Sequence, residues 1–306
     1  MKKARALQKG DTIGIAAPAS PFDRNEFKKG VKTIEEMGFS VYHRDDIFDQ
    51  TRYLAGSDNR RAKELMELFT NSKVHAILFA RGGYGSQRII PLLDKELIQH
   101  HPKPIVGFSD VTALLTFLRQ ECHLPTFYGP VVSMLGKGCE PMTREHLMLA
   151  LMTPGPLGKI PTGSANVLKP GNAVGKLVGG CLSLINSSMG TPYELRTEDS
   201  ILFIEEIGEK VYVLDRMLTQ LKNAHKLEHV RGILFGSLVT LQGEPHDPHA
   251  MLNDVLADFQ GPVIVDFPAG HTQTFVTLPL GAELEMNAII GEKPLLKFTT
   301  GMFSER

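Results

Sequence analysis

The feature that most constrains the fold is a regular alternation of short apolar runs with longer amphipathic segments in the first half of the chain. Short apolar runs are typical of buried strands, and the longer segments carry their apolar residues on one helical face. The expected strands are Thr12–Ala17, Phe39–His43, Val74–Ala80 and Pro104–Phe108, and the expected helices are Asn25–Met37, Asn59–Thr70, Ser86–Leu93 and Val111–Gln120. This order predicts a mostly parallel sheet with helices on both of its faces.

A dense run of prolines and glycines interrupts the chain after this region. Its members are Pro154, Gly155, Pro156, Gly158, Pro161, Gly163, Pro170 and Gly171. Such a density of residues that break regular structure indicates a linker. The chain has 306 residues, and domains of roughly 150 residues predict two of them. We therefore expect a first domain over 1–153, a linker over 154–174 and a second domain over 175–306.

The second half is predicted to be a smaller α/β domain with a β-rich tail. The expected helices are Leu182–Ser188, Val211–Leu221 and a segment near Met251–Phe259, and the expected strands are Ser200–Ile204, Arg231–Phe235, Pro262–Val265, Thr274–Leu280, Glu283–Met286 and Leu295–Thr299. The best of these patterns is the helix from Val211, whose apolar residues recur every three or four positions.

Charge and composition exclude several classes of function. The 33 basic residues balance 34 acidic ones, so there is no positive excess to bind a nucleic acid backbone. No apolar run approaches the roughly 20 residues that span a bilayer, and the apolar stretch Ile13–Ala17 is too short for a secretion signal. Three scattered cysteines offer neither a metal motif nor a disulfide framework. We expect a cytoplasmic protein with no metal, no cofactor, and neither a nucleic acid nor a membrane as partner.

Three polar residues follow apolar strands, where ligands bind in α/β sheets. Ser109 stands at a strand-to-helix turn, Glu205 follows the strand Ser200–Ile204, and His271 comes shortly after Pro262–Val265. A serine there can act as a nucleophile, a histidine can take its proton, and a carboxylate can hold the imidazole. Each residue also has a plainer interpretation: a helix cap, a solvated strand end and a surface histidine.

A glycine-rich segment, Arg81 to Ser86, follows the strand Val74–Ala80. It matches neither the P-loop nor the dinucleotide-binding pattern. Its glycines allow a backbone to approach a ligand closely, and Arg81 is available for a carboxylate. The alternative is a tight strand-to-helix turn in which Arg81 caps a strand or pairs with a structural carboxylate.

Several ordered blocks spread over nearly the whole chain give it a family resemblance. They are Gly14–Ser20, Arg81–Gly85, Gly107–Leu114, Gly129-Pro130, Gly179–Leu184, Gly190–Pro192, Ile204–Ile207 with Asp215–Leu218, and Gly270-His271 with Leu278–Gly281. In these blocks the chain resembles the LD-carboxypeptidases, serine peptidases also called muramoyltetrapeptide carboxypeptidases. The resemblance implies a flavodoxin-like N-terminal domain, similar to class I glutamine amidotransferase domains, and a smaller β-rich α/β C-terminal domain.

The resemblance also implies roles for individual residues. It assigns the nucleophile to Ser109, the orienting carboxylate to Glu205 and the base to His271. Adjacent strand residues point to opposite faces, so only one of Glu205 and Glu206 can face the site. Backbone N–H groups of Asp110 and of the Gly82-Gly83 segment are the oxyanion-hole candidates. For the terminal carboxylate of the substrate we expect Arg81, with Arg88 and Arg216 as alternatives.

The implied reaction releases terminal D-alanine from a recycled cell-wall tetrapeptide by hydrolysis of an L,D-amide bond. The expected partner is the muropeptide tetrapeptide, and the resemblance implies a homodimer. One alternative is a microcin-immunity-type peptidase that cleaves peptidyl- or aminoacyl-adenylates; those proteins tend to be longer and to stack an aromatic residue on the base, whereas this chain has no tryptophan. Another is a non-catalytic module that binds a small anion through Arg81, Gly82 and Gly83.

Overall fold

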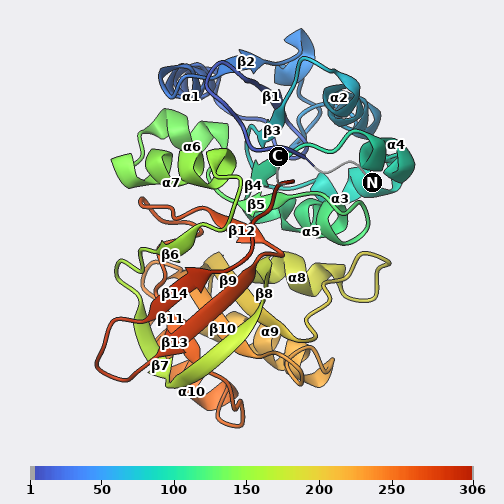
Figure 1. Ribbon diagram of the computed structural model, residues 1–306. Helices are drawn as coiled ribbons and strands as arrows, with labels where there is room; N and C mark the ends of the chain where they lie inside the picture. The colour runs from blue at the N-terminus through green and yellow to red at the C-terminus, as the bar shows by residue number, and fades with distance from the viewer. Residues whose placement is uncertain (1–3, 305–306) are drawn as a thin grey trace. The chain divides into compact units, whose positions relative to one another are not determined.

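The computed structural model describes residues 4–304, which form two compact units (Figure 1). Of the described residues, the first unit takes in 4–155, 273–279 and 302–304. The second comprises Pro156–Thr272 and Leu280–Gly301. The chain therefore passes from the first unit to the second after Gly155, returns to the first at Gln273–Pro279, completes the second at Leu280–Gly301 and returns to the first at Met302.

A six-stranded sheet in the order β12-β5-β4-β3-β1-β2 organises the first unit. The strands are β1 (Thr12–Ala16), β2 (Ser40–Tyr42), β3 (Ala76–Phe79), β4 (Ile105–Gly107), β5 (Thr126–Tyr128) and β12 (Leu278–Leu280). All pairings among β1 to β5 are parallel. The order 2-1-3-4-5 is that of flavodoxin, which confirms the predicted flavodoxin-like architecture.

Helices cover both faces of this sheet, with α1, α6 and α7 on one side and α2 to α5 on the other (Figure 1). Their bounds are α1 (Arg24–Glu36), α2 (Asp58–Thr70), α3 (Ser86–Ile89), α4 (Lys95–His100), α5 (Thr112–Gln120), α6 (Val132–Lys137) and α7 (Pro141–Met152), with 3₁₀ turns at Asp45–Phe48, Ile90–Leu92 and Ser109–Val111. Side chains of Asp23 and Ser57 accept hydrogen bonds from the first turns of α1 and α2. No helix in residues 4–304 is long and apolar enough to cross a membrane.

The second unit is built on an eight-stranded mixed sheet in the order β6-β14-β13-β8-β9-β10-β11-β7. Its strands are β6 (Gly158–Ile160), β7 (Asn166–Lys169), β8 (Gly171–Cys181), β9 (Ser200–Glu209), β10 (Gly232–Thr240), β11 (Val263–Val265), β13 (Glu283–Ala288) and β14 (Leu295–Phe298), and its helices are α8 (Leu182–Ser188), α9 (Val211–Asn223) and α10 (Pro248–Val255). The central strands β8 to β11 are parallel. Their apolar side chains pack against α8, α9 and α10 in one buried core.

Two stretches of the chain differ from what local composition indicates. The segment 154–174, expected as a linker, contributes β6, β7 and the start of β8 to the second sheet. Its prolines and glycines lie at strand ends and turns, as at Gly171, where φ is 148°. Of the expected strand Thr274–Leu280 only Leu278–Leu280 is regular, and Gln273–Pro279 belongs to the first unit rather than to the second.

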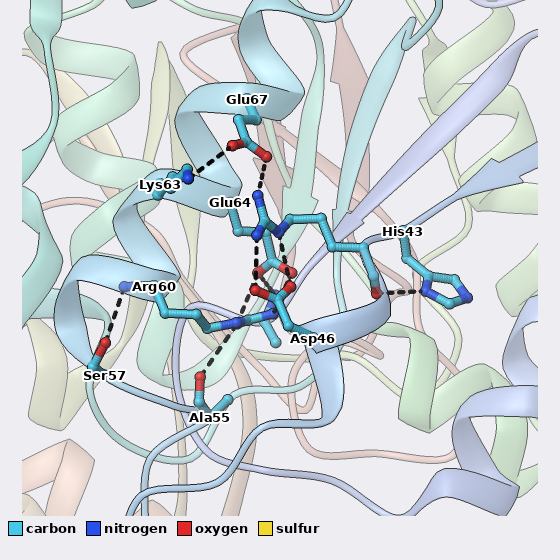
Figure 2. Close-up of polar contacts among 10 residues, drawn as sticks. His43, Asp46, Ala55, Ser57, Arg60, Lys63, Glu64 and Glu67 are labelled. Carbon is cyan, nitrogen blue, oxygen red and sulfur yellow. Dashed lines mark hydrogen bonds and ion pairs between the residues drawn. The ribbon is translucent and has the colours of Figure 1, made fainter.

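Arg60 and the buried Glu64 form an ion pair on helix α2 of the first unit (Figure 2). The Glu64 carboxylate is fully buried, accepts a hydrogen bond from Arg60 at 2.6 Å, and accepts another from the Ala17 backbone N–H at 2.7 Å. Arg60 also donates to the carbonyl of Ala55. Burial raises the pKa of Glu64 to about 7, although Arg60 and the Ala17 N–H favour the charged form.

We expect Glu64→Gln to change the pH dependence of stability. A carboxyl whose pKa is 4.5 unfolded and about 7 folded stabilises the fold at low pH and loses that contribution as the pH rises through 7. Between pH 5 and pH 8 the free energy of unfolding of the parent, relative to Glu64→Gln, should fall by about 2–3 kcal/mol. Urea denaturation of both proteins at the two pH values measures this, and parallel pH curves would contradict it.

Candidate functional site

Ser109 stands directly after β4 with its backbone in the left-handed region, at φ 67°. Phe108 before it is fully extended, and a 3₁₀ turn that leads into α5 begins at Ser109 itself. For a residue with a Cβ this conformation costs about 1–2 kcal/mol. Such strain in a non-glycine residue points to a functional position when the surroundings hold it in place. The chain thus turns sharply at the serine, at the carboxyl edge of the sheet.

Contacts from two neighbouring elements hold the serine backbone. The Ser109 N–H donates to the Tyr128 hydroxyl at 3.1 Å, and Tyr128 on β5 is completely buried. On the other side the Thr112 hydroxyl donates to the Ser109 carbonyl at 2.7 Å. The rings of Phe108 and Tyr128 both pack against Phe275, with centroids 5.2 and 6.1 Å away. Both backbone polar groups of the strained residue are therefore satisfied.

The glycine-rich segment after β3 lies against the serine. A Cβ added at Gly82 would stand 2.9 Å from the Ser109 Cβ and 3.2 Å from its Oγ, so only glycine fits there. Gly83 has φ 104° and lies against Ser20, which donates its N–H to the Gly82 carbonyl and accepts from the Tyr84 N–H. Within residues 4–304 the N–H groups of Gly82 and Gly83 donate no hydrogen bond. Gly82 is buried and Gly83 is exposed, and their N–H groups remain candidates for binding an anion.

The side chain of Asp110 ties this segment to the serine. It is buried, and its two oxygens accept hydrogen bonds from the Gly85 N–H at 3.2 Å and the Ser86 N–H at 2.8 Å. The Ser86 hydroxyl donates in return to the Asp110 carbonyl at 2.6 Å. Burial raises the pKa of Asp110, opposed by the hydrogen bonds from Ser86 and Gly85. Three hydrogen bonds therefore join Asp110, the residue after Ser109, to the end of the glycine-rich segment.

In the second unit, Glu205 and His271 form a direct pair. Glu205 on β9 is fully buried, and its Oε2 lies 2.7 Å from His271 Nδ1 and accepts the His271 backbone N–H at 3.2 Å. Gly270 makes this possible, because a Cβ there would lie 2.6 Å from Glu205 Oε2 and its φ is 105°. A carboxylate on Nδ1 requires that nitrogen to carry the proton, so Nε2 is the ring nitrogen that can accept one.

The neighbouring carboxylate, Glu206, has a separate set of partners. It is buried as well, and it accepts hydrogen bonds from the Ser183 N–H at 2.7 Å and the Ile207 N–H at 2.9 Å. Ser183 lies in the first turn of α8, so Glu206 caps that helix. Desolvation, followed by the charges of Glu205 and Glu206, raises the pKa of the buried Cys181 thiol beside it well above its usual value. Adjacent residues on β9 thus face different surroundings, and Glu205 is the one that meets the histidine.

The arginines expected at the substrate carboxylate make other contacts. Arg81 is exposed and donates to the Pro21 carbonyl at 2.7 Å. Arg88 forms an ion pair with Asp58 at 2.7 Å, and Arg216 lies over the Tyr212 ring. A carboxylate-binding role for any of them stays a prediction.

Two groups of supporting residues were not singled out from the sequence. The Tyr128 hydroxyl and Ser86 both hold the turn at the serine. Tyr128 directly precedes the Gly129-Pro130 block, which is the only signal in the sequence that marks its position. Among the described residues, no cluster of three or more His, Cys, Asp or Glu side chains is arranged to hold a metal ion.

Comparison with known families gives independent information. A model of the LD-carboxypeptidase N-terminal domain matches residues 13–129, and a model of the LD-carboxypeptidase C-terminal domain matches residues 174–286. The chain belongs to the LD-carboxypeptidase family. This confirms the resemblance drawn from the sequence blocks and classes the protein as a serine-type carboxypeptidase.

The names of similar proteins point to two different activities. A probable murein peptide carboxypeptidase of Bacillus subtilis is 38% identical over 291 residues, covering 93% of this chain and 91% of the relative. The microcin C7 self-immunity protein MccF of Escherichia coli is 29% identical over 326 residues, covering 93% and 92%. Among solved structures, wild-type MccF has a TM-score of 0.90 at 26% identity, covering 99% of this chain and all of that one. A muramoyltetrapeptide carboxypeptidase from Oxalobacter formigenes has a TM-score of 0.84 at 26% identity, covering 95% and 99%.

We expect Glu205→Gln to be far more damaging to activity than Glu206→Gln. An amide on His271 Nδ1 can select the wrong tautomer, and such a change costs about 10⁴-fold in a serine protease. Glutamine at 206 retains an oxygen for the Ser183 N–H, so that variant should stay within tenfold of the parent. The measurement is kcat/KM for peptide hydrolysis, with thermal melts to confirm folding. The reverse order of activities would assign the catalytic carboxylate to Glu206.

Proposed function

We propose that the chain is an L,D-carboxypeptidase that releases terminal D-alanine from cell-wall muropeptide tetrapeptides in the cytoplasm. The amide bond it hydrolyses joins the L-centre of the third residue, diaminopimelate or lysine, to the D-alanine. The observation that carries the proposal is the buried Glu205–His271 pair, taken with a serine held in a left-handed turn. Relatives named for murein peptide and muramoyltetrapeptide carboxypeptidase activity support the choice of substrate.

The proposed mechanism uses an acyl-enzyme. Ser109 attacks the carbonyl of the scissile amide while His271 Nε2 accepts the hydroxyl proton. The protonated His271 then gives this proton to the nitrogen of the departing D-alanine. A water molecule, deprotonated by the same histidine, hydrolyses the ester and restores Ser109. Throughout, Glu205 keeps the Nδ1 proton in place and stabilises the imidazolium that forms at each step.

The negative charge of the tetrahedral intermediate needs hydrogen-bond donors. We propose the backbone N–H groups of Asp110 and of the Gly82-Gly83 segment, because the Gly82 backbone lies against the Ser109 side chain. The Ser109 N–H itself donates to the Tyr128 hydroxyl, which makes it a poor candidate. Removal of one oxyanion donor typically costs about 10²–10³ in rate.

Hydrolysis of an aminoacyl- or peptidyl-adenylate is the second candidate function. It is favoured by the fold similarity to MccF, one of whose structures contains aspartyl sulfamoyl adenosine. A further MccF structure, of a variant that replaces a tryptophan by phenylalanine, contains adenosine monophosphate. This chain also has no tryptophan, and the variant shows that a nucleotide can be held without that ring. We rank the tetrapeptide first because relatives named for murein peptide and muramoyltetrapeptide carboxypeptidase activity support it.

We expect the parent to release D-alanine from tetrapeptides and Ser109→Ala to release none while remaining folded. Ser109 is the first residue of its 3₁₀ turn and not the N-cap, so loss of its hydroxyl should cost little stability, whereas a lost nucleophile removes the acyl-enzyme. Mass spectrometry of muropeptides before and after incubation identifies the bond cleaved, and a parallel assay with an aminoacyl sulfamate competitor tests the adenylate alternative. Turnover by Ser109→Ala within tenfold of the parent would remove Ser109 from the mechanism.

We further expect a preference for a free terminal carboxylate over its amide, and a loss of that preference in Arg81→Lys. A desolvated carboxylate needs a charged partner, and a guanidinium binds it with two parallel hydrogen bonds that an ammonium cannot reproduce. For this role Arg81 must exchange its contact with the Pro21 carbonyl for the substrate. An unchanged ratio of kcat/KM for free-acid and amidated tetrapeptides would show that the carboxylate is bound elsewhere.

A further inference from the structure

We propose that Arg61, on helix α2, is a positioning residue that fixes the position of the glycine-rich segment relative to Ser109. This inference rests on the proposed function, because it concerns the geometry that Ser109 needs for attack. Arg61 is completely buried, although a guanidinium is costly to remove from water. The hydrogen-bond partners of this buried guanidinium show which segments of the chain it connects.

The donors of Arg61 are directed at two backbone carbonyls from separate loops. Nη1 donates to the carbonyl of Pro18, in the loop after β1, and to the carbonyl of Gly85 at 2.7 Å, in the loop after β3. Nη2 forms an ion pair with Asp58, which Arg88 shares. One side chain therefore bridges two of the loops at the carboxyl edge of the sheet. Its charge is favoured by the carboxylates of Asp58 and Asp110 and opposed by the charge of Arg88.

The Gly85 contact continues directly to the serine. Gly85 accepts from Arg61 through its carbonyl and donates its N–H to Asp110, the residue after Ser109. Ser86 adds two more hydrogen bonds to the same aspartate. A shift of the Gly85 carbonyl must therefore displace either the Asp110 side chain or the glycine segment against it.

The Pro18 contact supports the same segment from the other side. Two residues later, Ser20 donates its N–H to the Gly82 carbonyl and accepts the Tyr84 N–H. One helical turn beyond Arg61, Glu64 accepts the Ala17 N–H. Helix α2 thus holds the loop after β1 at Ala17 and Pro18, and this loop in turn holds the proposed oxyanion segment at Gly82 and Tyr84.

The geometry at Gly85 shows how tightly this contact is built. A Cβ at Gly85 would lie 2.8 Å from Arg61 Nη1 and 2.6 Å from Leu54, and φ at Gly85 is 126°. The absence of a side chain at position 85 is what lets the buried guanidinium reach the carbonyl. Arg61 and Gly85 therefore depend on each other. A side chain at position 85 would clash with the guanidinium, and without Arg61 the Gly85 carbonyl would lose this donor.

The test compares Arg61→Met and Arg61→Lys with the parent, per folded molecule and well below the melting temperature of each. Misplacement of reacting groups by about 1 Å can cost 10²-fold in rate. We expect Arg61→Met to lose about 10²-fold in kcat with KM within threefold, and Arg61→Lys, which can still donate to one carbonyl, to recover part of the loss. A purely structural role would lower the melting temperature and leave kcat per folded molecule unchanged, which would overturn the proposal.

Two variants on the same helix serve as matched controls. Lys63 is solvent-exposed, so Lys63→Met should keep kcat within twofold of the parent. Asp58→Asn removes the charge that pairs with Arg61 but leaves both carbonyl contacts, so it should retain at least a third of the activity. A loss in Asp58→Asn as large as in Arg61→Met would assign the effect to charge pairing and contradict the positioning role.

A readout that is independent of the substrate separates this proposal from the proposed function. Hydrogen exchange followed by mass spectrometry reports the Gly85 and Ser86 amides that donate to Asp110. We expect at least tenfold faster exchange there in Arg61→Met and parental exchange in Lys63→Met. If the parent fails to cleave any tetrapeptide while this difference is found, the function fails and the positioning role stands. Parental exchange in Arg61→Met overturns the positioning role whatever the substrate is.

Discussion

The left-handed backbone at Ser109 is the constraint on which the first unit depends. A residue with a Cβ adopts it only when its surroundings stabilise it by more than the strain costs. Here Tyr128 and Thr112 hold the N–H and carbonyl of the serine, while Asp110 connects the next residue to the glycine segment. Ser20 adds the loop after β1 through its contacts with Gly82 and Tyr84. The loops after β1, β3 and β4 are therefore interdependent, joined by hydrogen bonds between side chains of one segment and the backbone of another.

In the second unit, two adjacent carboxylates, Glu205 and Glu206, are both buried. Strand alternation separates them, so that Glu205 meets a histidine and Glu206 meets the Ser183 N–H in the first turn of α8. Each carboxylate is compensated by its own donors, as buried charges require. The helix cap at Glu206 therefore supports the strand from which Glu205 reaches His271.

The parallel sheet and the position of Ser109 could be predicted because both depend on local patterns. Apolar runs followed by turn residues mark β1, β3 and β4 without knowledge of distant contacts. Tyr128, Arg61 and the strands at 158–160 and 166–169 could not be found in this way. Arg61 looks like any arginine on an amphipathic helix, and only the packing of α2 under two loops buries it. Likewise, glycines and prolines at 154–174 indicate turns, but the pairing of the strands between them is set by β11 and β14 far along the chain.

The return of the chain to the first unit bears on the order of events during synthesis. Residues 4–155 emerge from the ribosome first, yet β12, which flanks β5, and Phe275, which packs on Phe108 and Tyr128, come more than a hundred residues later. Until then β5 has an unpaired edge, of the kind that invites pairing with other chains. The serine turn therefore gains the Phe275 ring and the β12 edge only once residues 273–280 have been made. A chain that stops short of these residues carries Ser109 without part of the packing around it.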